Sequence, residues 1–293
     1  MGDNEAGADC NAQDWCGIDW TRWFPFSLES TRTGAIPDAP GIYRIRAAGA
    51  PNLMYIGRTD TSLRNVFNGI RQSTARMQMP WVDPYPVAPA LWAWKDAKGF
   101  SFEFSAVPME ESATRRKTGL CYLLYRYRQE KRDSPACNFG RFHRKYRCSS
   151  TEREGIAGGP IAPQDPKNPA GGPATSPLPP TGSPGDANWM GLAWSPKREL
   201  LAHTTTAVPQ AQGVYLLFDG GAGPLLAVRT AENCSQALFE LSKNPPEGRT
   251  LAFMVCCEAK PVAGHNHRER QCDLAGHFIE LNLEAPALQF REE

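Results

Sequence analysis

Alternating hydrophobic and polar positions predict a short antiparallel sheet in the first half of the chain. Residues 41–47, Gly-Ile-Tyr-Arg-Ile-Arg-Ala, alternate apolar and basic side chains, and residues 52–57 form a second run rich in β-forming residues. Gly49 and Pro51 between these runs are turn residues, so we expect a β-hairpin. Residues 100–107 alternate again and predict a third strand.

Two further segments have the spacing of helices. In residues 62–77 the apolar positions three or four apart are Leu63, Phe67 and Ile70. The residues able to cap the start of this helix are Asp60, Thr61 and Ser62. In residues 114–132 the side chains expected to face inward are Leu120, Leu123, Leu124 and Tyr127. The order hairpin, helix, strand, helix predicts an α+β unit in which helices flank a three-stranded antiparallel sheet.

The pattern recurs in the second half of the chain. The sequence Trp-x-Gly-x-x-Trp stands at 15–20 and at 189–194, and Pro-x-Ala-x-Gly-x-Tyr stands at 37–43 and at 209–215. The other two matches pair 57–67 with 228–238 and 135–139 with 286–290. Because four matches follow one order, we infer a tandem duplication. The four tryptophans of the first match are expected to anchor each lead-in segment in the core.

A segment rich in proline and glycine separates the two copies. Residues 149–187 contain nine Pro and seven Gly in 39 positions and have no apolar face to bury, which predicts a disordered linker. The expected organisation is a tail and tryptophan-rich lead-in (1–36), a first domain (37–148), the linker, and a second domain with its own lead-in (188–293). The predicted fold class is therefore α+β, with two small units of three strands each.

Composition narrows the class of protein. No run of 18 or more apolar residues exists, so we expect no membrane partner, and the acidic start of the chain does not resemble a secretory signal. The nine cysteines have no regular spacing and are expected to be reduced. We therefore predict a cytoplasmic protein.

The net charge of +1 is unevenly distributed. Residues 1–150 carry 21 Lys and Arg against 15 Asp and Glu, whereas residues 151–293 carry 11 against 16. The stretch 115–147 holds eleven of these cations and only two acids, Glu130 and Asp133. Aromatic residues are interleaved with the cations, so we expect a polyanion such as nucleic acid to bind this basic helix and tail. The acidic second domain is expected to bind a protein partner instead.

The hairpin carries the strongest motif. Gly41-Ile42-Tyr43, eleven intervening residues, Tyr55-Ile56-Gly57, and then Arg64 in the following helix resemble the GIY-YIG nuclease family. Pro135 and Asn138 stand where that family has a Pro and an Asn after its last helix. The resemblance covers about 37–141, with a degenerate copy at 209–291, and it implies binding and hydrolysis of nucleic acid, with DNA as the expected substrate.

The resemblance implies roles for individual residues. Tyr43 and Tyr55 would orient or deprotonate a water that attacks a phosphodiester, which requires both rings to point into one pocket. Arg64 would stabilise the charge that develops on the phosphate. The other residues expected to contact substrate are Arg58, Asn68, Asn138, Arg115, Arg116 and Arg141. Some family members have a histidine at the position of Asn68, and an asparagine cannot take a proton in its place.

The metal ligand of the family is missing. Family nucleases bind one Mg²⁺ or Mn²⁺ through a glutamate of the last helix, and here this position is Cys121. A neutral thiol is a poor ligand for these hard cations. Glu130 lies nine residues further along the helix, about 13 Å by helical rise, so it is too far to compensate. Glu110 and Glu111 could reach the site only if the helix start were unravelled.

The second copy departs further from the family. It retains Tyr215, but Leu226-Ala227-Val228 replaces Tyr-Ile-Gly, Ser235 stands at the arginine position, and Gly276 aligns best with the glutamate position. Three functions stay open. The first is a nucleic-acid-binding protein with weak or absent hydrolysis, needing no metal. The second is an active Mg²⁺- or Mn²⁺-dependent endonuclease with a compensating acid, and the third is a protein-interaction scaffold.

Overall fold

The computed structural model describes residues 9–27, 30–260 and 262–291, so the first eight residues of the predicted tail lie outside it. Its contacts divide the chain into a first unit, Met1–Ala174, and a second unit, Thr175–Glu293. This boundary lies within the predicted linker segment 149–187. The α+β class with antiparallel sheets is confirmed in both units.

The sheet of the first unit contains the predicted hairpin and third strand. Strand β2 (Gly41–Ala47) pairs antiparallel with β3 (Leu53–Thr59) on one side and with β4 (Phe102–Pro108) on the other. A fourth strand, β1 (Phe24–Pro25), joins the other side of β4 and comes from the lead-in. The sheet therefore has four strands instead of the expected three. The sequence did not predict β1, because a strand of two residues is too short to show an alternating pattern.

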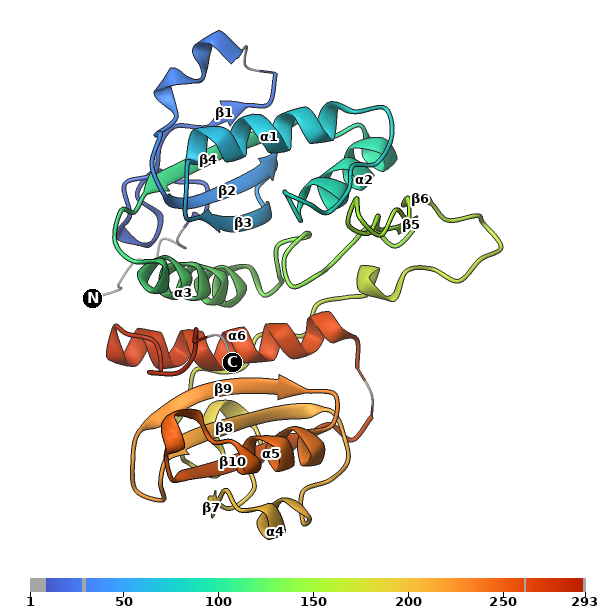
Figure 1. Cartoon of the computed structure of the whole chain (residues 1–293). Coiled ribbons are helices and arrows are strands. Elements are labelled where there is room, and N and C mark those ends of the chain that lie inside the picture. Colours follow the sequence, from blue (N-terminus) through green and yellow to red (C-terminus); the bar gives the residue numbers. More distant parts are fainter. Residues whose placement is uncertain (1–8, 28–29, 261, 292–293) are drawn as a thin grey trace, which may run out of the picture. The chain divides into compact units, whose positions relative to one another are not determined.

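Helices cover both faces of this sheet. Helix α1 (Leu63–Ala75) begins after Ser62, whose hydroxyl accepts a hydrogen bond from the Asn65 amide, as the capping pattern predicts. Helix α3 (Ala113–Lys131) is the other predicted helix. Helix α2 (Ala88–Lys98) was not predicted, because six consecutive buried residues at its start leave no helical periodicity to detect. Figure 1 shows α1 and α2 on one side of the sheet and α3 on the other.

Alternation along β2 assigns its side chains to these two layers. Tyr43 and Ile45 belong to the core on the α1 and α2 side. Ile42 faces α3, where its side chain lies against Gly119, and Arg44 packs with the tryptophans of the lead-in. The hairpin motif therefore presents its tyrosine to one layer and its charged residue to the other.

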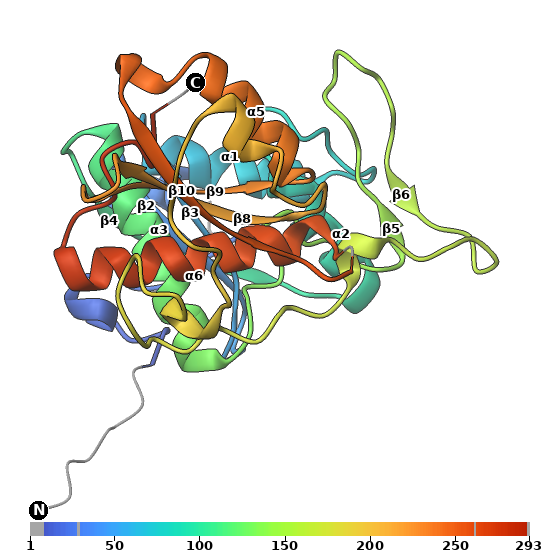
Figure 2. The same cartoon turned by 90° about the horizontal axis from the view of Figure 1, so that it is seen from below.

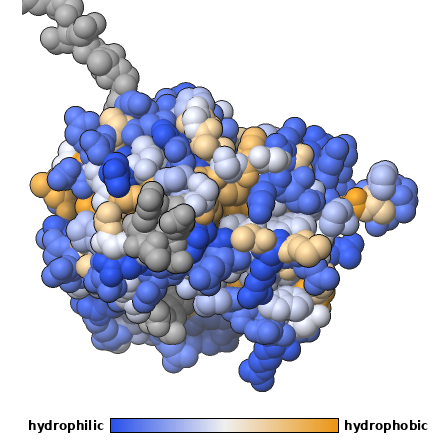
Figure 3. Space-filling model, turned by 90° about the horizontal axis from the view of Figure 1, so that it is seen from above, coloured by the Kyte–Doolittle hydropathy of each residue, from blue (hydrophilic) through white to orange (hydrophobic). Residues whose placement is uncertain are grey.

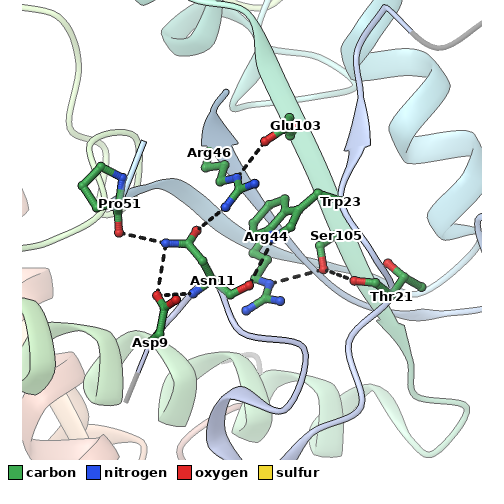
Figure 4. Close-up of polar contacts among 9 residues, drawn as sticks. All are labelled: Asp9, Asn11, Thr21, Trp23, Arg44, Arg46, Pro51, Glu103 and Ser105. Atoms are coloured by element: carbon green, nitrogen blue, oxygen red, sulfur yellow. Dashed lines mark hydrogen bonds and ion pairs between the residues drawn. The ribbon is translucent and has the colours of Figure 1, made fainter. Parts of the chain in front are cut away.

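The lead-in of the first unit is anchored as predicted. Trp15 and Trp20 are buried, and the Trp20 indole N–H donates to the Trp15 carbonyl at 3.1 Å. Arg44 is 0% exposed and donates to the carbonyls of Cys10 and Ala12 at 2.5 and 2.8 Å. Figure 4 shows Arg44 beside Ser105 and Trp23, with Arg46 paired to Glu103 nearby. The lead-in is therefore held to β2 through this arginine.

The first part of the predicted linker is ordered, so the prediction of a disordered linker is not confirmed. Strand β5 (Tyr146–Arg147) pairs with β6 (Gly159–Pro160), and these strands are visible in Figure 2. Further along, the amide of Asn168 donates to the carbonyl of Arg144 at 2.9 Å. The segment has no apolar face, but its backbone finds hydrogen-bond partners in the residues that follow α3, and this orders it.

The second unit repeats the order of strands and of the helices α1 and α3, but between α5 and β10 it has only a 3₁₀ turn where the first unit has α2. Its sheet order is β7-β10-β8-β9, and the bounds are β7 (Arg198–Glu199), β8 (Gly213–Asp219), β9 (Leu225–Ala231) and β10 (Leu251–Cys257). Its helices are α4 (Ala202–Thr205), α5 (Cys234–Lys243) and α6 (Gly264–Asn282). Figures 1 and 2 show α5 and α6 on opposite faces of this sheet. Short 3₁₀ turns in the two units span Trp15–Gly17, Ser30–Ala35, Pro169–Gly171, Trp189–Gly191 and Pro246–Gly248.

Local details recur between the units and support the duplication. Each hairpin has a register shift at the same place, between Ile45 and Arg46 and between Leu217 and Phe218. The Trp194 indole donates to the Trp189 carbonyl at 3.0 Å, as Trp20 does to Trp15 in the first unit. The residue after the first tryptophan has a positive φ in both units, at Cys16 and Met190. Trp189 and Trp194 are buried, as predicted.

Two further properties concern contact with a membrane or another apolar surface: the apolar length of the helices and the distribution of hydrophobic residues on the surface. Among the residues that the structure describes, no helix has both the length and the apolar character needed to cross a bilayer. On the face that Figure 3 shows, hydrophobic residues lie singly or in small groups among hydrophilic ones.

Candidate functional site

The two motif tyrosines lie side by side, as the hairpin predicts. The ring centroids of Tyr43 and Tyr55 are 5.9 Å apart, and a side-chain hydrogen bond joins the two hydroxyls. Tyr43 is 5% exposed and stacks on Phe104 at 5.2 Å, whereas Tyr55, on the edge strand β3, is half-buried. The pair is therefore a rigid inner phenol bonded to a more accessible outer one.

The two glycines of the motif make room for this arrangement. A methyl group on Gly57 would lie 2.4 Å from a ring carbon of Tyr55 and 2.6 Å from Cζ of Tyr43. A methyl group on Gly41 would lie 2.2 Å from the carbonyl oxygen of Val107. Both contacts are shorter than atoms allow, so Gly57 lets the phenols meet over the strand and Gly41 lets β2 approach β4.

Burial keeps both phenols protonated. It raises the pKa of Tyr43 well above its usual value, and the hydrogen bond to Tyr55 raises this pKa further. Burial also raises the pKa of Tyr55, although the hydrogen bond with Tyr43 and the nearby Arg58 charge oppose the shift. A phenol with a raised pKa is a poor general base at neutral pH but can donate a hydrogen bond.

An ion-pair chain begins at the end of β3. Arg58 pairs with Asp60, and Asp60 also accepts from Arg116 of α3 at 2.8 Å. The Arg58 side chain is 25% exposed, whereas that of Arg116 is 7% exposed and also donates to the Met109 carbonyl. The two arginines lower the pKa of Asp60. Arg116 thus ties α3 to the hairpin, and Arg58 is the more accessible of the two cations.

The sequence suggested only a possible helix-capping role for Asp60, whereas its carboxylate pairs with Arg58 and Arg116. Its carboxylate occupies the guanidinium groups that a phosphate would need. We expect Asp60→Asn to strengthen binding of a DNA oligonucleotide and to steepen its salt dependence by about one phosphate contact. The measurement is fluorescence anisotropy over a series of salt concentrations.

The matched control for this variant is Glu103→Gln. It also removes a carboxylate from an arginine pair, but Glu103 pairs with Arg46 near the other end of β2, whereas Arg58 lies opposite Ile42 near the start of β2. The control should leave the affinity and the salt dependence close to those of the original chain. An Asp60→Asn protein that binds no better than the control would show that Arg58 does not contact the ligand.

Arg64 lies in the first turn of α1, with its guanidinium turned toward the preceding loop. It donates to the carbonyls of Ile36 at 3.0 Å and Gly34 at 3.3 Å, and it pairs with Asp38 at 3.3 Å. Its side chain is 32% exposed. These bonds hold the loop before β2 against α1, so an approaching phosphate would have to compete with Asp38.

The two asparagines predicted to contact substrate differ in whether the side chain has an unused hydrogen-bonding atom. The Asn138 amide donates to the Ile56 carbonyl at 2.8 Å and accepts from the Ile56 amide at 2.9 Å. It therefore pairs with β3 as another strand would, and its role in the fold is structural. The side-chain oxygen of Asn68 is buried without a hydrogen-bond partner, so this residue of α1 keeps an unused acceptor.

The remaining predicted cations are placed along α3 and after it. The Arg115 side chain is exposed on the first turn of α3. Arg141 donates to the Ser134 carbonyl at 2.7 Å and lies 3.4 Å from Asp133, and its side chain is 15% exposed. Arg58 and Arg115 are therefore the predicted contacts with the greatest freedom to meet a ligand, and Arg141 is partly engaged.

The residues present do not fit a family-type metal site. Cys121 is a half-buried thiol on α3, and α3 packs on the sheet face opposite to Tyr43. Within the described part of the chain, the ionisable side chains that influence the pKa values of the two phenols are the other phenol of the pair, Tyr85, Cys137 and Arg58, and none of these is a carboxylate. Among the described residues, no cluster of three or more His, Cys, Asp or Glu side chains is arranged to bind a metal ion.

The carboxylates that could have replaced the missing metal ligand either bond to other residues or lie outside α3. Glu130 accepts from the Trp15 indole at 2.9 Å and lies near Arg126, so it belongs to the anchor of the lead-in. Glu110 and Glu111 are exposed in the loop before α3, whose start is intact and capped by Ser112. Glu110, Glu111 and Glu130 therefore do not replace the missing metal ligand at position 121.

The second unit lacks the paired phenols. Strand register places Tyr215 opposite Arg229 and Leu217 opposite Ala227, so Ala227-Val228-Arg229 replaces Tyr-Ile-Gly. The sequence alignment to residues 226–228 was wrong by one position. The amide of Val228 donates to the Gln289 side chain, as Ile56 does to Asn138, which confirms this register.

A second correction concerns the last helix. Both α3 and α6 have 19 residues and end at a left-handed cap, Arg132 and Leu283. This places Cys272, not Gly276, at the position of Cys121. Periodicity alone allowed the shift of one helical turn, because residues four apart share a helix face. The position of Arg64 is Ser235, as aligned, since Leu63 and Cys234 make equivalent backbone bonds to Ala39 and Ala211.

Comparisons with family models, with curated proteins and with solved structures found no match. The resemblance to GIY-YIG nucleases therefore rests on the motif residues and their order along the chain.

Proposed function

We propose that the first unit is a nucleic-acid-binding module related to GIY-YIG nucleases and that it hydrolyses phosphodiesters weakly or not at all. The observation that carries this proposal is the pair of hydrogen-bonded phenols, Tyr43 and Tyr55, meeting over Gly57 on adjacent strands. A hairpin that serves only to pack has no need of this combination of two tyrosines and a glycine. DNA is the first substrate to test.

Binding is attributed to the cations around the hairpin and along α3. Arg58 is near enough for its charge to lower the pKa of Tyr55 and is partly exposed, and Arg115 is exposed on the first turn of α3. Phosphate groups bind such side chains with release of counterions, so affinity should fall as the salt concentration rises. The outer phenol of Tyr55 can add a hydrogen bond to the bound backbone.

Weak hydrolysis follows from the chemistry of the site. Both phenols have raised pKa values, so neither readily takes a proton from water. Cys121 supplies a thiol at the position where the related nucleases have a metal-binding glutamate. Arg64 is bonded to the loop before β2, so its charge is partly neutralised by Asp38.

A plasmid-nicking assay with Mg²⁺ or Mn²⁺ tests this proposal. We expect the original chain to bind DNA at low salt and to produce little or no nicking, because the metal position lacks an oxygen ligand. Cys121→Glu should nick no more than its matched neutral control Cys121→Gln, because residue 121 lies on the sheet face opposite to Tyr43 and a carboxylate there would not meet the phenols.

Two results would contradict the proposal. Strong nicking by the original chain that is lost in Tyr43→Phe or Arg64→Ala would establish an active endonuclease with a different ligand set. Absence of binding to any DNA or RNA at low salt would favour the interaction scaffold. Partner binding by the acidic second unit stays a prediction, and this unit has no second tyrosine with which to form the phenol pair.

A further inference from the structure

A basic cavity of about 610 Å³ lies in the first unit, away from the hairpin motif in sequence. It is formed by the end of α2 and by the segments that follow α3. The charged side chains that line it are Asp96, Lys98, Arg141, Arg144 and Lys145. Its volume is in the range of pockets that bind a nucleotide-sized ligand.

The walls of this cavity are held by backbone hydrogen bonds. The amide of Phe142 donates to Ala170 at 3.0 Å, and that of Ile161 donates to Lys145 at 2.7 Å. Gly171 lies so close to Arg144 that a methyl group on it would be 2.5 Å from the Arg144 Cα. Segment 159–172, which the sequence assigns to a linker, therefore builds one wall and fixes the backbone that carries the cations.

The cavity has an excess of positive charge. Four cations and one acid line it, which is a net charge of 4 − 1 = +3. The single carboxylate, Asp96, already accepts a hydrogen bond from the Tyr146 hydroxyl at 2.7 Å. The exposed cations are Lys98, Arg144 and Lys145. Their charged groups remain hydrated in the unbound protein and can still turn toward an anion.

The same cations act on a buried histidine in the cavity wall. His143 is 7% exposed and lies edge-on to Trp94 at 4.7 Å and to Tyr146 at 5.0 Å. Burial lowers its pKa, and the charges of Lys98, Lys145 and Arg144 lower it further. Three cations from two separate elements therefore act on one point, as a phosphate site requires.

We propose that this cavity binds a phosphate group of the nucleic acid, as a contact additional to the tyrosine hairpin. Lys98 from α2 and Lys145 from the segment after α3 approach the phosphate as point charges. The fork-shaped guanidinium of Arg144 can bind two of its oxygens. The assignment rests on the proposed function, because nucleic acid is the phosphate-bearing ligand of the first unit.

The test compares two double variants of the full chain. Lys98→Gln with Lys145→Gln removes two charges from the cavity. Arg153→Gln with Lys167→Gln removes two charges from exposed positions of the first unit that do not line it. All four residues are exposed, and circular dichroism confirms folding of each variant. Anisotropy of a labelled single-stranded oligonucleotide and of a duplex is recorded over a series of salt concentrations.

We expect the cavity variant to bind more weakly and the slope of log K against log salt to become shallower by about two, about one for each lost phosphate contact. The control variant should keep the original slope. Equal slopes in both variants would overturn the cavity site and leave the proposed function standing. Absence of binding by the original chain would overturn the proposed function instead.

Calorimetry with inorganic phosphate and with a dinucleotide distinguishes a free phosphate ion from a nucleic-acid phosphate as the ligand of the cavity. If the original chain binds inorganic phosphate more tightly than a dinucleotide, and the cavity variant loses that binding, the cavity takes a free anion and the nucleic-acid assignment is wrong. Tighter binding of the dinucleotide, reduced only in the cavity variant, supports the assignment.

Discussion

Replacing Arg44 with methionine should lower the free energy of unfolding of the first unit by about 3 kcal/mol or more. Arg44 is 0% exposed and satisfies the carbonyls of Cys10 and Ala12, with a further bond to Ser105 at 3.3 Å. Methionine has similar length but donates no hydrogen bond, so these buried carbonyls would lose their partner. Urea unfolding of the full chain measures the loss.

The guanidinium also lies over the indole rings of the lead-in. Its Cζ is 4.3 Å from the ring centroid of Trp20 and 4.8 Å from that of Trp23. Burial lowers the pKa of Arg44 to about 10, so the group stays charged at neutral pH and the cation–π contacts persist. Removal of the charge should therefore release residues 10–26 from the sheet, which hydrogen exchange of that peptide would detect.

Arg46→Met is the matched control. Arg46 lies two positions along the same strand and pairs with Glu103. It also contacts the lead-in, donating to the Asn11 side chain at 3.1 Å and lying 4.2 Å from the Trp23 ring centroid, but its side chain is 18% exposed and its charge is partly solvated. We expect a loss of about 1 kcal/mol or less and a smaller increase in exchange of residues 10–26 than for Arg44→Met, because the contacts of Arg46 with the lead-in are partly solvated. Equal losses for the two variants would show that burial of Arg44 does not decide the attachment of the lead-in.

The second large effect is expected for Gly57→Ala. The added methyl would lie 2.4 Å from Tyr55, and 2.6 and 2.7 Å from Cζ and the hydroxyl of Tyr43. Tyr43 is buried and stacked on Phe104, so it has little freedom to withdraw. We expect a loss of about 1 to 3 kcal/mol, as for other overpacked sites, together with separation of the two phenols.

Gly34→Ala controls for the change of glycine to alanine in the same unit. A methyl on Gly34 meets no atom within 4 Å, so it should leave stability nearly unchanged. The phenol pair is followed by ultraviolet titration, since loss of the Tyr43–Tyr55 bond lowers the pKa of Tyr43 toward its usual value. A Gly57→Ala protein with the stability and titration of Gly34→Ala would contradict the role assigned to Gly57.

Residues close together in sequence account for the parts of the fold that could be predicted. The hairpin, helices α1 and α3 and strand β4 follow from patterns that span one element each. The same is true of the phenol pair, because Tyr43 and Tyr55 lie on strands joined by a short turn. The prediction of two buried tryptophans in each lead-in used the repeat, which doubles the available signal.

Features that depend on distant residues could not be predicted. Helix α2 begins with consecutive buried residues, and its boundaries are set by packing on α1. The partners of Arg44 are more than 30 positions away, so the alternation of apolar and basic residues in 41–47 could not reveal that this arginine is buried. Segment 149–174 is ordered by bonds to residues before it, which composition does not encode.

By itself, the sequence determined the α+β class and the hairpin. It also predicted the tandem repeat and, through the resemblance to GIY-YIG nucleases, a cysteine at the position of that family's glutamate. Tertiary structure alone decided which charges are available. It buries Arg44 and Arg116, bonds Arg64 to a loop, and gathers Lys98 with Arg144 and Lys145 around one cavity. The physical reason is that a side chain's type is local, whereas its burial and its partners depend on which distant segments pack beside it.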